Sequence, residues 1–255
     1  VVAENIGSVA FTVNRTGYAG NSVDVNYSTA DGLPPAGAQD GSDYNALAGT
    51  VTFAATETSK PLSINILNDK ILEPVETFTF SLTGAVGEGT LGTQTVATVT
   101  INDNDSLFSF TTPAVTVNES DGVGNPTIVP LTISRTGNVG SSVTLPVNTV
   151  NGTAFSVLDY NALTASLIFG PGQVSTNISV VLVNDTVVET SENLTVDMGV
   201  PIGEAALGAI ASTVINIDDD DSSLGFEIAA TTNSENTGVV NVVVTRTGNV
   251  NSQVR

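Results

Sequence analysis

Apolar and polar residues alternate in short runs along most of the chain, as expected for half-buried β-strands. Residues 9–13, 23–27 and 62–66 show the alternation clearly, with an apolar side chain at every second position. Clusters of Gly, Asn, Asp and Pro, which favour turns, separate these runs, and no stretch keeps a helical period beyond one or two turns. The pattern therefore predicts an all-β protein.

The alternating pattern is itself repeated. The sequence Asp-Tyr-Asn-Ala-Leu at residues 43–47 returns at residues 159–163, a spacing of 116 residues. An Arg-Thr-Gly turn at residues 15–17 returns at 135–137 and again at 246–248. A period of this length corresponds to a whole domain rather than to one turn of a solenoid. About seven short strands in each period predict an antiparallel β-sandwich of the immunoglobulin-like kind.

We therefore predict tandem immunoglobulin-like antiparallel β-sandwiches. The first covers residues 1–105, the second residues 106–221, and residues 222–255 form the truncated start of a third. The first copy is expected to lack its leading strand segment, because residues 1–4 correspond to residues 116–119 and nothing in the first copy matches residues 107–115. We interpret the chain as a piece of a longer repetitive protein. Without Cys or Trp, aliphatic and Phe packing must hold each sandwich together.

Composition narrows the range of functions. Six basic and twenty-six acidic residues give a net charge of -20, which disfavours nucleic acid and anionic membranes as partners. The absence of His and Cys excludes a Ser-His-Asp triad and thiolate metal sites. Acid pairs could support glycoside hydrolysis, but a chain without Trp offers few sugar-binding platforms. We expect no enzyme activity, and membrane attachment only through parts outside this sequence.

Acidic residues gather in turns that follow strand ends. Like charges held together need a neutralising partner, and Ca²⁺ accepts six to eight oxygen ligands in flexible geometry. No EF-hand loop is present, so several loops would have to build each site. The pattern alone is explained equally well without a metal. Asp and Asn favour β-turns for backbone reasons, and an acidic surface exposed to water keeps a repetitive β protein soluble. The candidate metal ligands are Glu4, Asp31, Asp69, Glu73, Glu76, Asp103 and Asp105 in the first copy, and Glu119, Asp185, Glu189, Glu192, Asp219, Asp220 and Asp221 in the second.

Three motifs together resemble the Calx-beta repeat. They are Asp-Tyr before a Gly-Thr-Val-x-Phe strand, the pattern Asn-Asp…Glu…Glu-x-Phe, and a closing acidic run, all present within residues 43–105. The resemblance covers nearly the whole chain, as two near-complete repeats and the opening of a third. It implies an immunoglobulin-like sandwich in which calcium-binding members hold a cluster of Ca²⁺ ions at one tip, next to the following domain.

The resemblance also places the fourteen candidate residues at the family's ligand positions. The first copy departs from the charge-rich pattern at Asn68, Lys70 and Asn104, and the second at Asn151 and Asn184. The positive charge of Lys70 should weaken the first site. The second copy has the complete closing Asp triplet, so we expect it to bind Ca²⁺ better.

These observations predict a calcium-binding structural or adhesion module of a bacterial-type extracellular or cell-surface protein, facing a protein or carbohydrate ligand. The short apolar linkers at residues 106–108 and 222–224 suggest that Ca²⁺ stiffens the junction between neighbouring domains. The alternative is a calcium-independent spacer that displays an enzymatic or receptor-binding domain elsewhere. An intracellular sensor fits less well, because ligand positions have lost charge. The cut ends leave unpaired strands, which could also support head-to-tail self-association.

Overall fold

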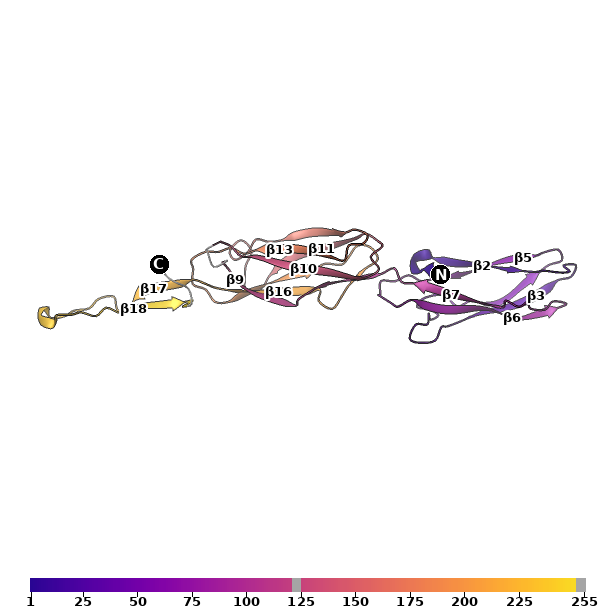
Figure 1. The fold of residues 1–255 in the computed structure, drawn as a ribbon, viewed down its shortest axis with the longest axis horizontal. Coiled ribbons are helices and arrows are strands. Elements are labelled where there is room, and N and C mark those ends of the chain that lie inside the picture. Colours follow the sequence, from indigo (N-terminus) through magenta and orange to yellow (C-terminus); the bar gives the residue numbers. More distant parts are fainter. Residues whose placement is uncertain (121–124, 251–255) are drawn as a thin grey trace. The chain divides into compact units, whose positions relative to one another are not determined.

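A computed structural model describes residues 1–120 and 125–250 of the chain (Figure 1). It divides into two compact units. The first consists of Val1–Leu107 with Gly137–Ser141 and Glu204–Ala206, and the second of Phe108–Thr136, Ser142–Gly203 and Leu207–Arg255. The described residues contain strands, turns and two short 3-10 segments but no α-helix. Residues 121–124 of the predicted second domain and 251–255 of the third lie outside the described part.

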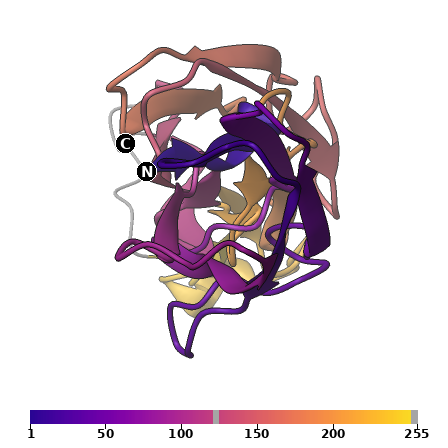
Figure 2. The ribbon, with the colours of Figure 1, turned by 90° about the vertical axis from the view of Figure 1, so that its right-hand side faces the viewer.

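The first unit has two sheets, whose strands are drawn in indigo and purple (Figure 2). The larger sheet has the order β1-β7-β6-β3-β4, and β2 pairs with β5 in the smaller one. All these pairs are antiparallel except β1 with β7, which is parallel. The elements are β1 (Val2–Ala3), η1 (Glu4–Ile6), β2 (Ser8–Asn14), β3 (Val23–Ala30), β4 (Ala48–Phe53), β5 (Ser59–Asn65), β6 (Glu76–Gly87) and β7 (Val96–Asn102).

Period-two alternation turns one face of each strand toward a shared core. Phe78 and Phe80 of β6 lie in this core with Ile101 of the adjacent β7 and Ile64 of β5 in the other sheet. The ring of Tyr44 stacks on Phe78 with centroids 4.0 Å apart, and Tyr44 is only 1% exposed. Tyr44 therefore belongs to the core of the first unit.

The second unit repeats this plan with more strands. One sheet has the order β12-β11-β14-β16-β9 and the other β13-β10-β8-β15. As β1 does with β7 in the first unit, β9 pairs with β16 in parallel. The strands are β8 (Ser106–Phe110), β9 (Ala114–Asn118), β10 (Ile128–Gly137), β11 (Val143–Asn151), β12 (Thr164–Phe169), β13 (Ser175–Val181), β14 (Glu192–Met198), β15 (Ala206–Leu207) and β16 (Ser212–Asp218).

The remaining residues form a hairpin-like pair of strands. β17 (Ser222–Phe226) pairs antiparallel with β18 (Val244–Gly248), and η2 (Glu235–Thr237) lies between them in sequence. The two units confirm the predicted all-β fold of tandem immunoglobulin-like sandwiches. In the described part of the chain, no helical segment has the length and apolar character that crossing a membrane requires.

Candidate metal centre

Twelve carboxylates come together in four groups of three, two in each unit. Within each group, one oxygen of every member lies within 4.8 Å of one oxygen of each other member. We name the groups after their first residues. The Glu4 group is Glu4, Asp69 and Asp105; the Asp43 group is Asp43, Glu73 and Glu76; the Glu119 group is Glu119, Asp219 and Asp221; and the Asp159 group is Asp159, Glu189 and Glu192.

Parallel strand pairing creates the Glu4 group. The β1–β7 register sets Ala3 opposite Asn102, so Glu4 at the end of β1 lies beside the acidic run that follows β7. The backbone N–H of Asp69, in the loop after β5, donates to Glu4 Oε1 at 2.8 Å. Asp105 is fully buried and Glu4 is 4% exposed. The carboxylates of Glu4 and Asp105 are thus removed from water beside a third carboxylate, that of Asp69.

The second unit builds the Glu119 group in the same way. The β9–β16 register sets Asn118 opposite Asp218, which brings Glu119 to the start of the closing Asp run. The backbone N–H of Asp221 donates to Asp219 Oδ1 at 2.9 Å. This contact folds the run into a compact turn, so that both Asp219 and Asp221 reach Glu119.

Asp103 and Asp219 connect the acidic run to the glutamate loop in each unit. Asp103 accepts a hydrogen bond from the backbone N–H of Asp105 at 2.8 Å and another from that of Glu73 at 3.2 Å. Asp219 makes the equivalent contact with the backbone N–H of Glu189 at 3.1 Å. Asp103 lies outside the four groups, yet it lines one small pocket together with members of the Glu4 and Asp43 groups.

The Asp43 and Asp159 groups contain two ligand candidates that sequence reasoning missed. Asp43 is 8% exposed, and its Oδ2 accepts a hydrogen bond from the backbone N–H of Gln39 at 2.6 Å. Asp159 is held the same way by the backbone N–H of Phe155, also at 2.6 Å. Both belong to the repeated Asp-Tyr-Asn-Ala-Leu motif. Recurrence of an acid beside a buried Tyr was the signal that could have found them.

Asp31, a predicted ligand, lies outside all four groups among the described residues. Its Oδ1 accepts the Tyr44 hydroxyl at 2.6 Å and the backbone N–H of Asp40 at 2.9 Å. Asn151 of the second unit accepts the Tyr160 hydroxyl at 2.5 Å in the same manner. An amide oxygen thus makes the same hydrogen bond as the carboxylate, so holding the Tyr does not require the negative charge of Asp31.

Two further candidates lie outside the four groups. Asp185 Oδ1 accepts the backbone N–H of Val187 at 2.7 Å, as Asp69 Oδ1 accepts that of Ile71 at 2.6 Å. Asp220 accepts a hydrogen bond from the hydroxyl of Ser120. The described structure therefore gathers ten of the fourteen candidates into groups and leaves out Asp31, Asp103, Asp185 and Asp220.

Several carboxylate oxygens in the groups are buried and receive no hydrogen bond. They are Oε2 of Glu4, both side-chain oxygens of Asp105, Oε1 of Glu119 and Oδ2 of Asp221. A buried acceptor without a donor costs about 1–3 kcal/mol, and more when it is charged. A divalent cation would satisfy these oxygens. The donor set consists of oxygens alone, which suits Ca²⁺ rather than a metal that prefers nitrogen or sulfur.

Burial raises the pKa values of several of these carboxyl groups. Burial first, and then the neighbouring carboxylates, raise the pKa of Asp105 to about 7 and that of Glu119 to about 8. The same causes raise the pKa of Glu73, Glu76 and Glu192 to about 7 each. Without a cation, the sites therefore hold protons near neutral pH.

Comparison with known proteins gives a consistent family match. The sequence profile of the Calx-beta domain matches residues 1–105, 102–221 and 217–255. Human sodium/calcium exchanger 2 is 32% identical over 243 residues, which cover 88% of this chain and 25% of the exchanger. Human extracellular matrix organizing protein FRAS1 is 31% identical over 260 residues, covering 97% of this chain and 6% of that protein. The chain thus spans a quarter or less of these relatives.

Among solved structures, the chain is similar to the calcium binding domain CBD12 of CALX1.1, with 22% sequence identity and a TM-score of 0.42. The match covers 84% of this chain and 95% of that one. CBD12 from CALX1.2 gives the same identity and TM-score, with 85% of this chain covered.

The raised pKa values predict that the metal-free protein loses stability as pH increases. A carboxyl group whose pKa is higher in the folded state than in the unfolded chain favours folding when it is protonated. That contribution is complete below about pH 4 and disappears as pH rises through the folded values of about 7 to 8. In chelator, the unfolding temperature should therefore fall between about pH 5 and pH 8.

Thermal unfolding followed by circular dichroism measures this dependence. Replacing Glu119 with Gln removes one titrating group and should flatten the curve, whereas Asp197→Asn, outside the four groups, should leave it unchanged. A metal-free protein that grows more stable toward pH 8 would contradict the assignment.

Proposed function

The chain belongs to the Calx-beta family, and from this premise we propose that its four carboxylate groups bind Ca²⁺. The observation that carries the proposal is the set of buried, unpartnered oxygens on Glu4, Asp105, Glu119 and Asp221. A protein that kept these sites empty would have to protonate them or leave them charged and desolvated. Bound Ca²⁺ supplies positive charge that replaces the protons.

The protein's own residues prepare these sites in three ways. Backbone N–H groups fix Glu4, Asp43 and Asp103, so these carboxylates are oriented before a cation arrives. The surrounding strands exclude water from Asp105, which strengthens its attraction for a cation. The turn closed on Asp219 brings the last acidic run of the second unit into the same arrangement. We propose that all twelve grouped residues hold Ca²⁺, with Asp103 as an additional ligand.

The remaining three candidates, Asp31, Asp185 and Asp220, are proposed as outer residues of the sites. They add negative potential and tie the loops together through their hydrogen bonds. The domain limits at residues 105 and 221 belong to the same proposal, because each places a closing acidic run at the end of its own sandwich.

At the level of the whole protein, we propose a non-enzymatic structural or adhesion module of an extracellular protein. Repeated domains joined by short linkers support this function, as does similarity to a relative whose name assigns it to the extracellular matrix. Its partner would be a protein or carbohydrate at a cell surface. Loops ordered by Ca²⁺ would restrict bending between neighbouring domains. The alternative is a spacer that works without Ca²⁺.

Calcium binding is tested by isothermal titration calorimetry on the full 255-residue chain. We expect saturable binding, with protons released into the buffer near neutral pH because Ca²⁺ displaces them. The double variant Glu119→Gln/Asp221→Asn should lose the binding contributed by the Glu119 group. Asp197→Asn removes one charge from the same unit outside the groups and serves as the matched control. Absence of any heat from millimolar Ca²⁺ would refute the proposal.

The first unit should respond to the charge at position 70. Lys70 is exposed next to Asp69, and the second unit has Thr186 at the equivalent position. Replacing Lys70 with Thr should raise the Ca²⁺ affinity of the first unit by about two- to fivefold, the range of an exposed charge pair. The effect should shrink at high salt because exposed charges are screened.

Calorimetry of Lys70→Thr in the Glu119→Gln/Asp221→Asn background removes the contribution of the Glu119 group from the titration. Lys60→Thr is the control, since Lys60 pairs with Glu57 at 2.8 Å. An unchanged affinity in Lys70→Thr would place the binding away from this loop.

Restriction of bending is tested by small-angle X-ray scattering. We expect the distribution of interatomic distances within the molecule to widen when Ca²⁺ is removed with chelator. Loops that lose their cation also lose their fixed geometry. The Glu119→Gln/Asp221→Asn variant should keep only the part of the Ca²⁺ response that the three remaining groups provide. If Ca²⁺ binds but scattering stays the same, the module is a passive spacer and the mechanism is wrong.

A further inference from the structure

Asn151 ends β11 and is the only asparagine in the sequence that is followed by glycine. An asparagine side chain loses its amide when the backbone nitrogen of the next residue attacks its Cγ atom, and glycine, which has no Cβ, hinders that attack least. Asn151 and Gly152 are both exposed, so water has access to the reacting atoms. The pair therefore has the residue types that spontaneous deamidation requires.

Two donors hold the side-chain oxygen of Asn151. Its Oδ1 accepts the hydroxyl of Tyr160 at 2.5 Å and the backbone N–H of Ser156 at 3.1 Å. Attack at Cγ puts negative charge on this oxygen, and donors that are fixed in advance stabilise such a charge as an oxyanion hole does. Tyr160 is only 1% exposed, so packing fixes the position of its hydroxyl.

The attacking nitrogen is also available. Among the described residues, the backbone N–H of Gly152 donates to no acceptor, whereas that of its counterpart Gly32 donates to the Ala38 oxygen at 3.1 Å. Gly152 lies beyond the last ladder pair of β11 and β14, which joins Asn151 and Leu194. Attack by the Gly152 nitrogen therefore costs no hydrogen bond of its N–H.

The first unit shows that the product fits the fold. Asp31, the counterpart of Asn151, is followed by Gly32 and accepts the Tyr44 hydroxyl at 2.6 Å and the backbone N–H of Asp40 at 2.9 Å. These are the same two kinds of contact that Asn151 makes. An aspartate at position 151 would keep both of them and add one negative charge.

We propose that Asn151 is a site of spontaneous deamidation, which converts the Asn-Gly of the second unit into the Asp-Gly of the first. The Gly152 nitrogen gives up its proton to water and forms a bond to Cγ of Asn151. The Cγ–Nδ2 bond breaks, and Nδ2 takes up a proton and leaves as ammonia. Water then adds to Cγ of the cyclic imide, the bond to the Gly152 nitrogen breaks, and an aspartate remains. Water is the only co-reactant.

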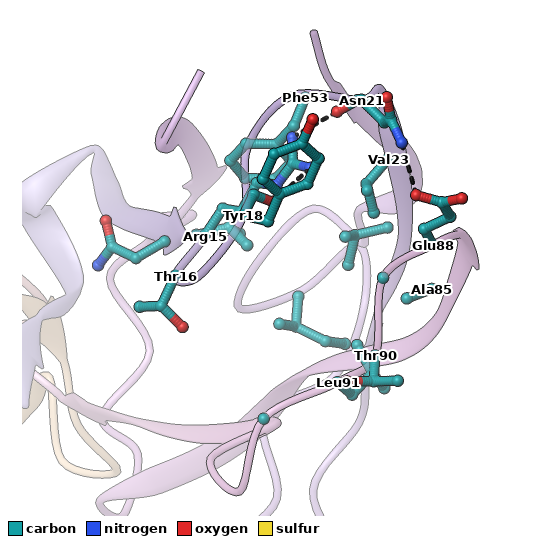
Figure 3. Close-up of a pocket in the computed structure, with 16 residues that line it drawn as sticks. Arg15, Thr16, Tyr18, Asn21, Val23, Phe53, Ala85, Glu88, Thr90 and Leu91 are labelled. Carbon is teal, nitrogen blue, oxygen red and sulfur yellow. Dashed lines mark hydrogen bonds between the residues drawn. The ribbon is translucent and has the colours of Figure 1, made fainter. Parts of the chain in front are cut away.

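Asn21 of the first unit provides an internal control. It is exposed and is followed by the small residue Ser22, but its amide has a different kind of partner. Its Nδ2 donates to Oε2 of Glu88 at 2.5 Å (Figure 3). This contact holds the group that would have to leave, and the carboxylate repels the negative charge that attack would create. Asn21 should therefore keep its amide over the period in which Asn151 loses it.

Peptide mass spectrometry on the full chain, incubated in mildly alkaline buffer and then digested, tests the proposal. We expect an acid at position 151, with Asn21 unchanged. Tyr160→Phe removes one donor and keeps the ring, so it should slow the conversion about tenfold or more. In urea both chains lose this contact, and their rates should be equal.

Two results would overturn the deamidation. One is an unchanged or faster conversion in folded Tyr160→Phe. The other needs no variant: a folded wild-type chain that keeps the amide of Asn151 in the time in which the same chain in urea loses it.

The consequence for Ca²⁺ rests on the proposed function. Asn151→Asp reproduces the product, and its added charge should raise the Ca²⁺ affinity of the second unit by about two- to fivefold in calorimetry. Asn177→Asp is the matched control, since it adds the same charge outside the four groups and keeps the oxygen that accepts the Thr132 hydroxyl at 2.8 Å. Equal affinities in the two variants would show that the modification does not act on the site. Absence of Ca²⁺ heat from every chain would instead refute the proposed function, while the mass spectrometry decides the deamidation independently.

Discussion

Negative charges held close together away from water are the constraint on which the acidic end of each sandwich depends. A carboxylate that is buried loses hydration, and each carboxylate beside it adds repulsion. Asp105 and Glu119 meet both conditions at once, which is why burial and then their neighbours raise their pKa values to about 7 and about 8. The chain contains too few basic residues to neutralise twelve grouped acids. Protons or a divalent cation must do so.

The strand pairing brings the mutually repelling carboxylates together. In both units a short leading strand runs parallel to the last strand of the sheet, and this pairing delivers Glu4 and Glu119 to the closing acidic runs. Backbone N–H groups then hold Asp103 and Asp219 so that each joins the acidic run to the glutamate loop. The same framework that packs the core therefore also brings the repelling groups together. Fold stability and cation binding are coupled through these contacts.

The internal repeat serves as a comparison within one molecule. Where the two units agree, as in the backbone N–H groups that donate to Asp43 and to Asp159, the shared contact shows what the framework needs. Where they differ, the difference has a physical meaning: Asn151 replaces Asp31 without loss of the Tyr hydrogen bond.

The sequence alone determined the strands, the repeat and the class of fold, because period-two alternation and turn residues are local properties of the chain. The resemblance to a known family extended this to most of the acidic positions. It did not reveal that Asp43 and Asp159 join the glutamates, since their role depends on a loop folding back over residues far away in sequence. Nor did it show that the oxygen of Asp31 is already engaged by Tyr44. Only the tertiary structure decided which carboxylates meet, because a charge cluster arises from distances between loops, and alternation along a strand carries no information about those distances.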